Sequence, residues 1–152
     1  MMTVRAATEA DAADWLRMRQ ALWPEDEPGE HRQEIARYFG GRRHEPLEVL
    51  LVADDAGTSV GFAELSIRNI VDSCSTDRVG YLEGWYVDPH LRRRGVGAAL
   101  IAAAERWAIA QGCTEFGSDV LVDNEGSLAA HKALGFEETS RVCCFRKDLK
   151  AE

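Results

Sequence analysis

The residues best suited to binding chemistry lie in one short turn: Arg92, Arg93 and Arg94, followed by Gly95 and Gly97. The turn follows an aromatic strand and leads directly into a helix, whose first amide groups lack partners within the helix and attract an anion. The two glycines carry no side chain, so these amides can approach a phosphate closely. The arginines add positive charge beside them. The segment therefore predicts a phosphate-binding turn.

Two familiar phosphate-binding patterns do not fit this turn. Its spacing is neither that of a P-loop, G-x-x-x-x-G-K-[ST], nor that of the dinucleotide fingerprint, G-x-G-x-x-G. A solvated run of charges at a helix start is the other interpretation of the arginines. Basic residues at that position oppose the helix dipole when no anion is bound. Both interpretations stay open on these residues alone.

Two carboxylates are the candidates for proton transfer. Glu83 lies in a strongly apolar strand, where a carboxylate is costly unless it is paired or faces a cleft. Asp119 ends the following strand, and the ends of parallel strands are where sites in α/β proteins collect. A turn at the strand end is the alternative for Asp119. Trp23, just before a proline, is either a core residue or part of a site.

The elements that must position these residues follow from hydrophobic periodicity and turn signals. Strands are predicted at residues 3–6, 48–53, 59–68, 79–87, 115–121 and 142–147. Helices are predicted from a cap at Thr8 to residue 22, at 31–39, at 97–111, and from 123 or 124 to 134. An acidic loop is predicted at 25–30, and Gly112 stands where a left-handed helix cap belongs.

The order of these elements predicts an α/β (α+β) fold with one mixed sheet. A helix joins the strands near residues 83 and 117, which implies a parallel pair with a right-handed crossover. The earlier strands are predicted to be antiparallel. The length of 152 residues, with no repeat and no long linker, indicates a single domain over residues 1–152.

Composition disfavours several classes of protein. Eighteen Lys and Arg oppose twenty-six Asp and Glu, a formal net charge of −8, which disfavours nucleic acid and favours a cationic partner. No apolar run approaches the roughly 20 residues that span a bilayer, and the N-terminus lacks the apolar core of a signal peptide. A cytoplasmic protein without a membrane partner is expected. The four cysteines show no CxxC spacing, so no metal site is expected.

The pattern Arg92-x-x-Gly95-x-Gly97, between an aromatic strand and a long helix, resembles the acetyl-CoA motif of the GCN5-related N-acetyltransferases, or GNAT family. Asn124 and the segment 131–136 resemble the family's later motif, and the element order matches over nearly the whole chain. The resemblance implies a central, mostly antiparallel sheet with a splayed parallel pair and helices on both faces. It also implies a β-bulge near residues 85–87.

Acetyl-CoA is the cofactor that this resemblance implies. Main-chain groups of Trp85 and Val87 would bind the pantetheine arm, and the amides of residues 93–98 would bind the pyrophosphate. His131 stands where many members carry a tyrosine that protonates the leaving thiolate. The implied cofactor-binding residues are Trp85, Tyr86, Val87, Arg92, Arg93, Arg94, Gly95, Val96, Gly97, Ala98, Asn124 and His131.

Several peptides are similar to the aminoglycoside 6'-N-acetyltransferases, among them ALWP at 21–24, GFAE at 61–64 and LEG at 82–84. The similarity implies acetylation of a primary amine on a cationic antibiotic, and hence resistance. The implied substrate-binding residues are Trp23, Asp26, Ile70, Glu83, Asp119 and Ser140. Relatives carry His, Tyr or Glu at the places of Asp26, Ile70 and Ser140, respectively.

The reaction expected from the resemblance is a direct attack of the substrate amine on the thioester, with Glu83 or Asp119 accepting the ammonium proton. An acetyltransferase acting on a polyamine, a metabolite amine or a protein N-terminus is the alternative within enzymes. A non-catalytic acyl-CoA-binding module is the alternative outside them. Relatives commonly form homodimers, some by pairing C-terminal strands, so a homodimer is expected, although the strand at 142–147 could also remain unpaired.

Overall fold

A computed structural model describes residues 2–41 and 46–151, and these form two compact units that meet in sequence between Asp119 and Val120. The first unit contains β1 (Thr3–Ala6), α1 (Ala12–Leu22), α2 (Pro28–Phe39), β2 (Glu48–Ala53), β3 (Ser59–Arg68), β4 (Val79–Val87), α3 (Val96–Ala110) and β5 (Phe116–Ser118). The second contains α4 (Glu125–Ala133). That the whole chain forms one domain stays a prediction from the sequence.

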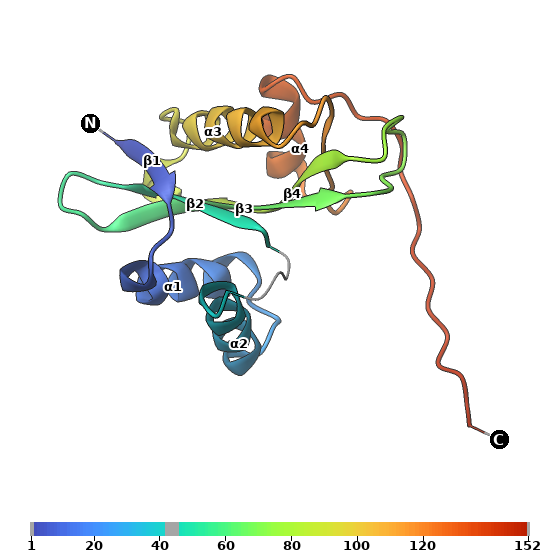
Figure 1. The fold of residues 1–152 in the computed structure, drawn as a ribbon, viewed down its shortest axis with the longest axis horizontal. Helices are drawn as coiled ribbons and strands as arrows, with labels where there is room; N and C mark the ends of the chain where they lie inside the picture. The colour runs from blue at the N-terminus through green and yellow to red at the C-terminus, as the bar shows by residue number, and fades with distance from the viewer. Residues whose placement is uncertain (1, 42–45, 152) are drawn as a thin grey trace. The chain divides into compact units, whose positions relative to one another are not determined.

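The five strands form one mixed sheet in the order β1-β2-β3-β4-β5 (Figure 1). The first three pairings are antiparallel, and β4 and β5, joined through α3, are parallel, as the element order predicts. The parallel ladder ends at the pair Leu82 and Ser118, whereas β4 continues to Val87. The carboxyl half of β4 therefore extends past its parallel neighbour, the arrangement expected for a splayed pair.

Helices cover both faces of the sheet in the first unit (Figure 1). On one face α3 packs closely on β3 and β4 because glycines stand beneath it. A Cβ on Gly80 would lie 2.8 Å from the Cβ of Ala108, and one on Gly61 would lie 3.3 Å from Cδ1 of Leu100. Side chains at these positions would push the helix away from the strands. The helix that leads out of the glycine turn is thus held directly against the strand that carries Glu83.

The opposite face carries α1 and α2 over a hydrophobic core. Its buried members are Trp15, Met18, Ile35, Val49, Leu51, Phe62 and Tyr86. The fully buried Trp15 meets the rings of Tyr38 and Phe39 edge to face, with centroids 5.4 and 5.9 Å apart. Such edge contacts suit the aromatic quadrupole and orient the two helices relative to each other. This face of the sheet becomes the floor of the candidate site.

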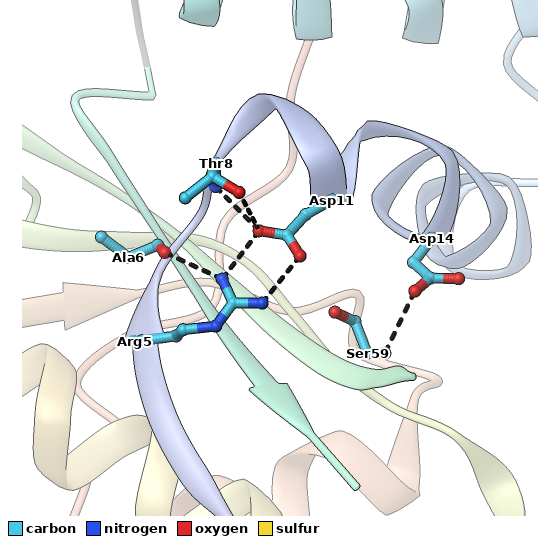
Figure 2. Close-up of polar contacts among 6 residues, drawn as sticks. All are labelled: Arg5, Ala6, Thr8, Asp11, Asp14 and Ser59. Atoms are coloured by element: carbon cyan, nitrogen blue, oxygen red, sulfur yellow. Dashed lines mark hydrogen bonds and ion pairs between the residues drawn. The ribbon is translucent and has the colours of Figure 1, made fainter. Parts of the chain in front are cut away.

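The start of α1 is fixed by an arginine–carboxylate fork, shown in Figure 2. Arg5 on β1 donates to Asp11 over 2.7 and 2.8 Å, and Asp11 also accepts from the amide of Thr8 at 2.8 Å. One turn later, Asp14 accepts from the amide of Ser59, the first residue of β3, at 3.1 Å. These contacts hold α1 to two strands, so the residue at its far end, Trp23, has a defined place over the sheet.

Several element boundaries differ from the sequence prediction. The second helix begins at Pro28 rather than at residue 31, because proline is well suited to a first helical position, where its missing N–H costs nothing. Part of the predicted acidic loop is therefore helical. The first turn after Thr8 is a 3₁₀ helix, Glu9–Asp11, and β5 covers only Phe116–Ser118.

The prediction of a strand at residues 142–147 is wrong for the described structure. Residues 136–151 form neither helix nor strand, and Val142 and Phe145 are 67% and 94% exposed. A strand exists only through hydrogen bonds to a neighbour, and the described part of the second unit contains no strand to pair with. An apolar, β-prone segment is consequently left extended.

None of the helices in the described residues has the length and apolar character that a membrane crossing requires.

Candidate active site

A β-bulge in β4 decides which way Glu83 faces. Glu64 on β3 pairs with Gly84, and the next residue, Leu65, pairs with Leu82, so Glu83 is the extra residue. A bulge interrupts the alternation of a strand, so Glu83 and Gly84 project toward the same face, that of α1 and α2. The bulge expected near residues 85–87 therefore lies two residues earlier, since those residues keep a regular register with β3.

A pocket of about 270 Å³ opens on this face of the sheet. Its described lining consists of Arg19, Trp23, Asp26, Glu34, Pro46, Glu64 and Glu83. Three of the predicted substrate-binding residues are thus brought together: Trp23 at the end of α1, Asp26 in the loop that follows and Glu83 on β4. Four described lining residues are acidic and one is basic, so the described wall carries an excess of negative charge. Such a wall attracts a cation.

Glu83 is held by two neighbours on β3. The hydroxyl of Ser66 donates to its Oε1. Arg68 donates from Nε to Oε1 at 2.9 Å and from Nη2 to Oε2 at 2.7 Å. This bidentate fork fixes the plane of the carboxylate. The carboxylate placed in an apolar strand is therefore paired and also faces a pocket, the two conditions that make such a position tolerable.

Asp119 joins the same group of contacts although it is not among the described residues that line the pocket. The phenol of Tyr81 donates to Oδ2 of Asp119, and the guanidinium of Arg68 lies 3.7 Å from the centre of the Tyr81 ring. Burial, followed by the bond to Asp119, raises the pKa of Tyr81 above its ordinary value, which keeps the phenol a donor. A chain of contacts thus runs from Glu83 through Arg68 and Tyr81 to Asp119.

Trp23 forms a wall of the pocket and also packs on the core. A Cβ on Gly84 would lie 2.6 Å from Cη2 of Trp23, so the indole rests directly on the bulged strand. The ring stacks on His31 with an interplanar angle of 18°, and the guanidinium of Arg19 lies 4.8 Å from its centre. The two interpretations of this tryptophan are therefore compatible, because the same ring packs against the core and lines the pocket.

The wall of the pocket includes a cluster of polar side chains centred on the buried Arg19. Its guanidinium donates to Glu64 and to Glu34, and its Nε donates to Nδ1 of His31 at 3.1 Å. Since Nδ1 accepts, the proton of the neutral imidazole belongs on Nε2, which lies 3.3 Å from the carbonyl oxygen of Trp23. The cluster therefore connects α2 and β3 to the end of α1.

Glu64 has the environment of a carboxyl group that can hold a proton. It is 2% exposed, and burial raises its pKa to about 7, although the charge of Arg19 opposes the shift. Desolvation disfavours the ionised form more than one well-placed guanidinium favours it. The floor of the pocket is thus a group that titrates near neutrality.

The sequence analysis did not identify Arg19, Glu34, Glu64, Arg68 or Tyr81. For Glu64 a signal was present, since it is a carboxylate in an apolar strand, the same criterion that selected Glu83. For Arg19 the signal was its place four residues after Trp15, on the apolar side of its helix. The other three have no distinguishing spacing, because their importance comes from neighbours on other helices and strands.

The predicted phosphate-binding turn has the backbone that an anion site requires. Gly95 caps α3 in the left-handed region, with φ +84°, and the amide of Ala99 donates to its carbonyl oxygen at 3.0 Å. The amides of Val96, Gly97 and Ala98 precede that bond and face the end of the helix. A Cβ on Gly97 would lie 3.0 Å from Cζ2 of Trp85, so this turn of the helix sits against that indole.

The three arginines of the turn are not equivalent. Arg92 donates from Nε to the carbonyl oxygen of Val87 at 2.8 Å and lies 5.6 Å from the ring of Tyr86, so it stabilises the turn itself. All three arginines are exposed, and Arg93 has φ +64°, a conformation that costs free energy outside glycine. The amides and the exposed arginines together fit the pyrophosphate of a nucleotide cofactor.

The remaining predicted substrate-binding residue of the first unit is Ile70, and Asn124, His131 and Ser140 belong to the second unit, which is described by itself. Ile70 is 85% exposed, just beyond the end of β3, and is not among the described lining residues. In the second unit, Asn124 caps α4 by accepting from the amide of Ser127 at 3.2 Å. Nδ1 of His131 donates to the carbonyl oxygen of Ser127 at 2.7 Å. The roles predicted for Ile70, Asn124, His131 and Ser140 stay predictions.

Comparison with known proteins identifies the class that this fold and site define. Residues 13–136 match the Acetyltransferase (GNAT) family, and the chain belongs to that family. The resemblance drawn from the glycine turn is thereby confirmed.

Similar proteins share almost the full length of the chain. An "Aminoglycoside N(6')-acetyltransferase type 1" of Klebsiella aerogenes is 49% identical over 146 residues, 96% of each chain. A protein of the same name from Stenotrophomonas maltophilia is 44% identical over 151 residues, 97% of this chain and 94% of the other. A structure of AAC(6')-Iy in complex with the bisubstrate analogue CoA-S-monomethyl-acetylneamine superposes with a TM-score of 0.90 at 36% identity, covering 98% and 99% of the two chains.

Proposed function

We propose that this chain is an acetyl-CoA-dependent acetyltransferase that modifies the 6'-amine of aminoglycoside antibiotics and so confers resistance. The observation that carries the proposal is the acidic pocket with a tryptophan wall on the bulged strand, in a fold shared with AAC(6')-Iy. Aminoglycosides are polycations, and a described wall with four carboxylates and one guanidinium is suited to bind them. The names of the similar proteins point to the same substrate class.

Acetyl-CoA would supply the acetyl group as a thioester: the amine would form the new C–N bond, the C–S bond would break, and coenzyme A would leave as a thiolate. The amides of Val96, Gly97 and Ala98, with the exposed Arg93 and Arg94, would hold its pyrophosphate at the end of α3. The main chain of β4 beyond Leu82, where the ladder to β5 has ended, offers hydrogen-bonding groups for an extended pantetheine arm. Trp85 and Val87 lie in this stretch.

Glu83 and Asp119 are the carboxylates that can remove a proton from the substrate ammonium. An alkylammonium carries no lone pair, so it must lose a proton before it can attack. Glu83 or Asp119, directly or through a water molecule, accepts that proton. Trp23 and the acidic wall hold the remaining sugar and its charges, so the amine is presented in a defined direction. Positioning of this kind removes a large part of the barrier to a reaction between two bound molecules.

Thiol release from acetyl-CoA, measured with purified protein and tobramycin, tests the proposal. We expect saturable release, and we expect replacement of Glu83 by Gln to reduce it. Spermidine is the comparison substrate, because an acidic pocket also attracts polyamines. Turnover of spermidine and not of tobramycin would contradict the aminoglycoside assignment. Binding of acetyl-CoA without release for any amine would indicate a non-catalytic acyl-CoA-binding module.

We also propose that the protein forms a homodimer through the segment 142–147. Its side chains include the exposed Val142 and Phe145, and an extended apolar segment without a strand partner is an edge that a second chain can pair with. Light scattering after size exclusion is expected to give twice the mass of the 152-residue chain. A monomeric mass at working concentration would contradict this proposal.

A cytoplasmic location is proposed as well. The described cysteines, Cys74, Cys113, Cys143 and Cys144, are free thiols, which suits a reducing compartment. Fractionation of producing cells into cytoplasmic and periplasmic extracts tests it.

A further inference from the structure

Arg68 occupies a central place among the groups that the proposed mechanism uses, yet nothing in its spacing singled it out. It is the last residue of β3, and its side chain is 37% exposed. Its guanidinium donates to both oxygens of Glu83 and stacks on Tyr81, whose phenol donates to Asp119. One side chain thus contacts one proposed proton acceptor directly and reaches the other through a single intermediate.

The geometry explains why this residue is an arginine. A guanidinium is planar and presents parallel N–H groups, so it can grip a carboxylate with two bonds and lie flat on an aromatic ring at once. An ammonium offers a point charge and cannot do both. Glu83 needs such a grip because it stands on a bulge, where the backbone ladder that would orient its neighbours is interrupted.

We propose that Arg68 is a positioning residue for acetyl transfer: it fixes the direction in which the carboxylate of Glu83 faces the substrate ammonium. The proposal rests on the proposed function. Arg68 itself exchanges no proton and forms no bond with the reacting atoms. Its effect reaches the reaction through the carboxylate that it orients, and removing that carboxylate must therefore remove the effect.

A double-mutant cycle tests this dependence. The variants are Arg68→Gln, Glu83→Gln and the two combined, and the quantity measured is kcat/KM for tobramycin at saturating acetyl-CoA. We expect Arg68→Gln to reduce kcat/KM by about tenfold or more when Glu83 is present, and by less than about twofold in the Glu83→Gln background. Arg68→Lys is expected to recover part of the loss. The KM for acetyl-CoA is expected to stay unchanged.

Arg5→Gln is the matched control. Arg5 also binds a carboxylate with two hydrogen bonds, of 2.7 and 2.8 Å, and its side chain is similarly exposed, at 43%, but it lies on β1 and is not among the described residues that line the pocket. We expect this variant to leave kcat/KM for tobramycin unchanged. Circular dichroism of each variant establishes that the fold is retained.

The outcomes separate this proposal from the proposed function. An equal loss on Arg68→Gln with and without Glu83 would overturn the positioning role, and so would no loss in either background. If the wild-type protein acetylates spermidine and not tobramycin, the aminoglycoside assignment fails, and the same cycle measured with spermidine decides the role of Arg68. Turnover of neither amine would overturn both proposals.

Discussion

Two arginine–carboxylate pairs at opposite ends of α1 behave in opposite ways. At the start of the helix, Arg5 and bonds from Thr8 lower the pKa of Asp11 to about 2 (Figure 2). At the end of the helix, Arg19 contacts Glu64, yet burial raises the pKa of Glu64 to about 7. The partner is the same kind of side chain in both pairs. The two pairs differ in how far their arginine is exposed to solvent: the side chain of Arg5 is 43% exposed and that of Arg19 only 4%.

The comparison indicates that an ion pair keeps the pKa of a carboxylate below its ordinary value only where the opposing effect of desolvation is smaller. Near the surface, two hydrogen bonds and a nearby charge outweigh the loss of water. In the interior, the loss of water outweighs a single guanidinium, particularly one that is shared with a second carboxylate, Glu34. The first pair consequently stabilises the contact between β1 and the start of α1. In the second pair, Glu64 is a pocket-lining carboxyl group with a pKa of about 7.

The largest expected effect comes from removing the buried guanidinium. Arg19→Met leaves Glu64 without its counter-charge and deprives His31 and Glu34 of a donor. We expect the free energy of unfolding to fall by about 3–5 kcal/mol at pH 7. Urea denaturation measures it. Arg5→Met is the comparison variant, expected to cost about 1 kcal/mol because its pair is partly solvated. Equal losses for the two variants would contradict the role assigned to burial.

The pH dependence of stability provides a sharper contrast. The folded state of Glu64 binds its proton more tightly than the unfolded chain, whose ordinary pKa is 4.5, so the resulting stability is present below pH 4.5 and is lost as the pH rises through about 7. Glu64→Gln cannot titrate. The stability of the wild type relative to this variant is therefore expected to fall by about 1–3 kcal/mol between pH 4.5 and pH 7.5. Urea curves at both pH values measure the change, and a constant or rising difference would refute it.

Asp11 is expected to show the opposite sign. Its pKa is lowered from 3.8 to about 2, so its contribution is present above pH 3.8 and is lost as the pH falls through about 2. Asp11→Asn is expected to destabilise the protein by about 1–2 kcal/mol at pH 7, and the difference from wild type should shrink toward pH 2. Denaturation at pH 7, 4 and 2.5 measures this trend. A difference as large at pH 2.5 as at pH 7 would show that charge is not its source.

The smallest expected effect on stability comes from the exposed partner of Arg19. The side chain of Glu34 is 45% exposed, so Glu34→Gln is expected to cost less than about 1 kcal/mol. Because Glu34 lines the pocket, the same variant is expected to raise the KM for tobramycin by about 2- to 5-fold without changing the KM for acetyl-CoA. Steady-state kinetics with each substrate varied in turn separate the two values. A change in the acetyl-CoA value alone would remove Glu34 from the substrate wall.

Local signals predicted the strand and the helix on either side of the glycine turn at residues 92–97. The aromatic strand, the glycines and the helix that follows are read from neighbouring residues, and β4 and α3 have nearly the predicted bounds. Local signals failed at residues 142–147, where the pattern is that of a strand but the described second unit offers no neighbour to pair with. A strand depends on a partner in a way that a helix does not.

The sequence by itself determined that this protein has a mixed α/β sheet, a glycine turn with three arginines before α3 and an acidic composition, because these follow from periodicity, glycine placement and charge. It also identified Glu83 as a candidate site residue, because a carboxylate in an apolar strand is costly unless it is paired or faces a cleft. Only the tertiary structure determined which way the Glu83 side chain faces and which residues hold it. The bulge that turns it toward the pocket and the grip of Arg68 both depend on the register between β3 and β4. Register is set by packing across the whole sheet, which no local pattern records.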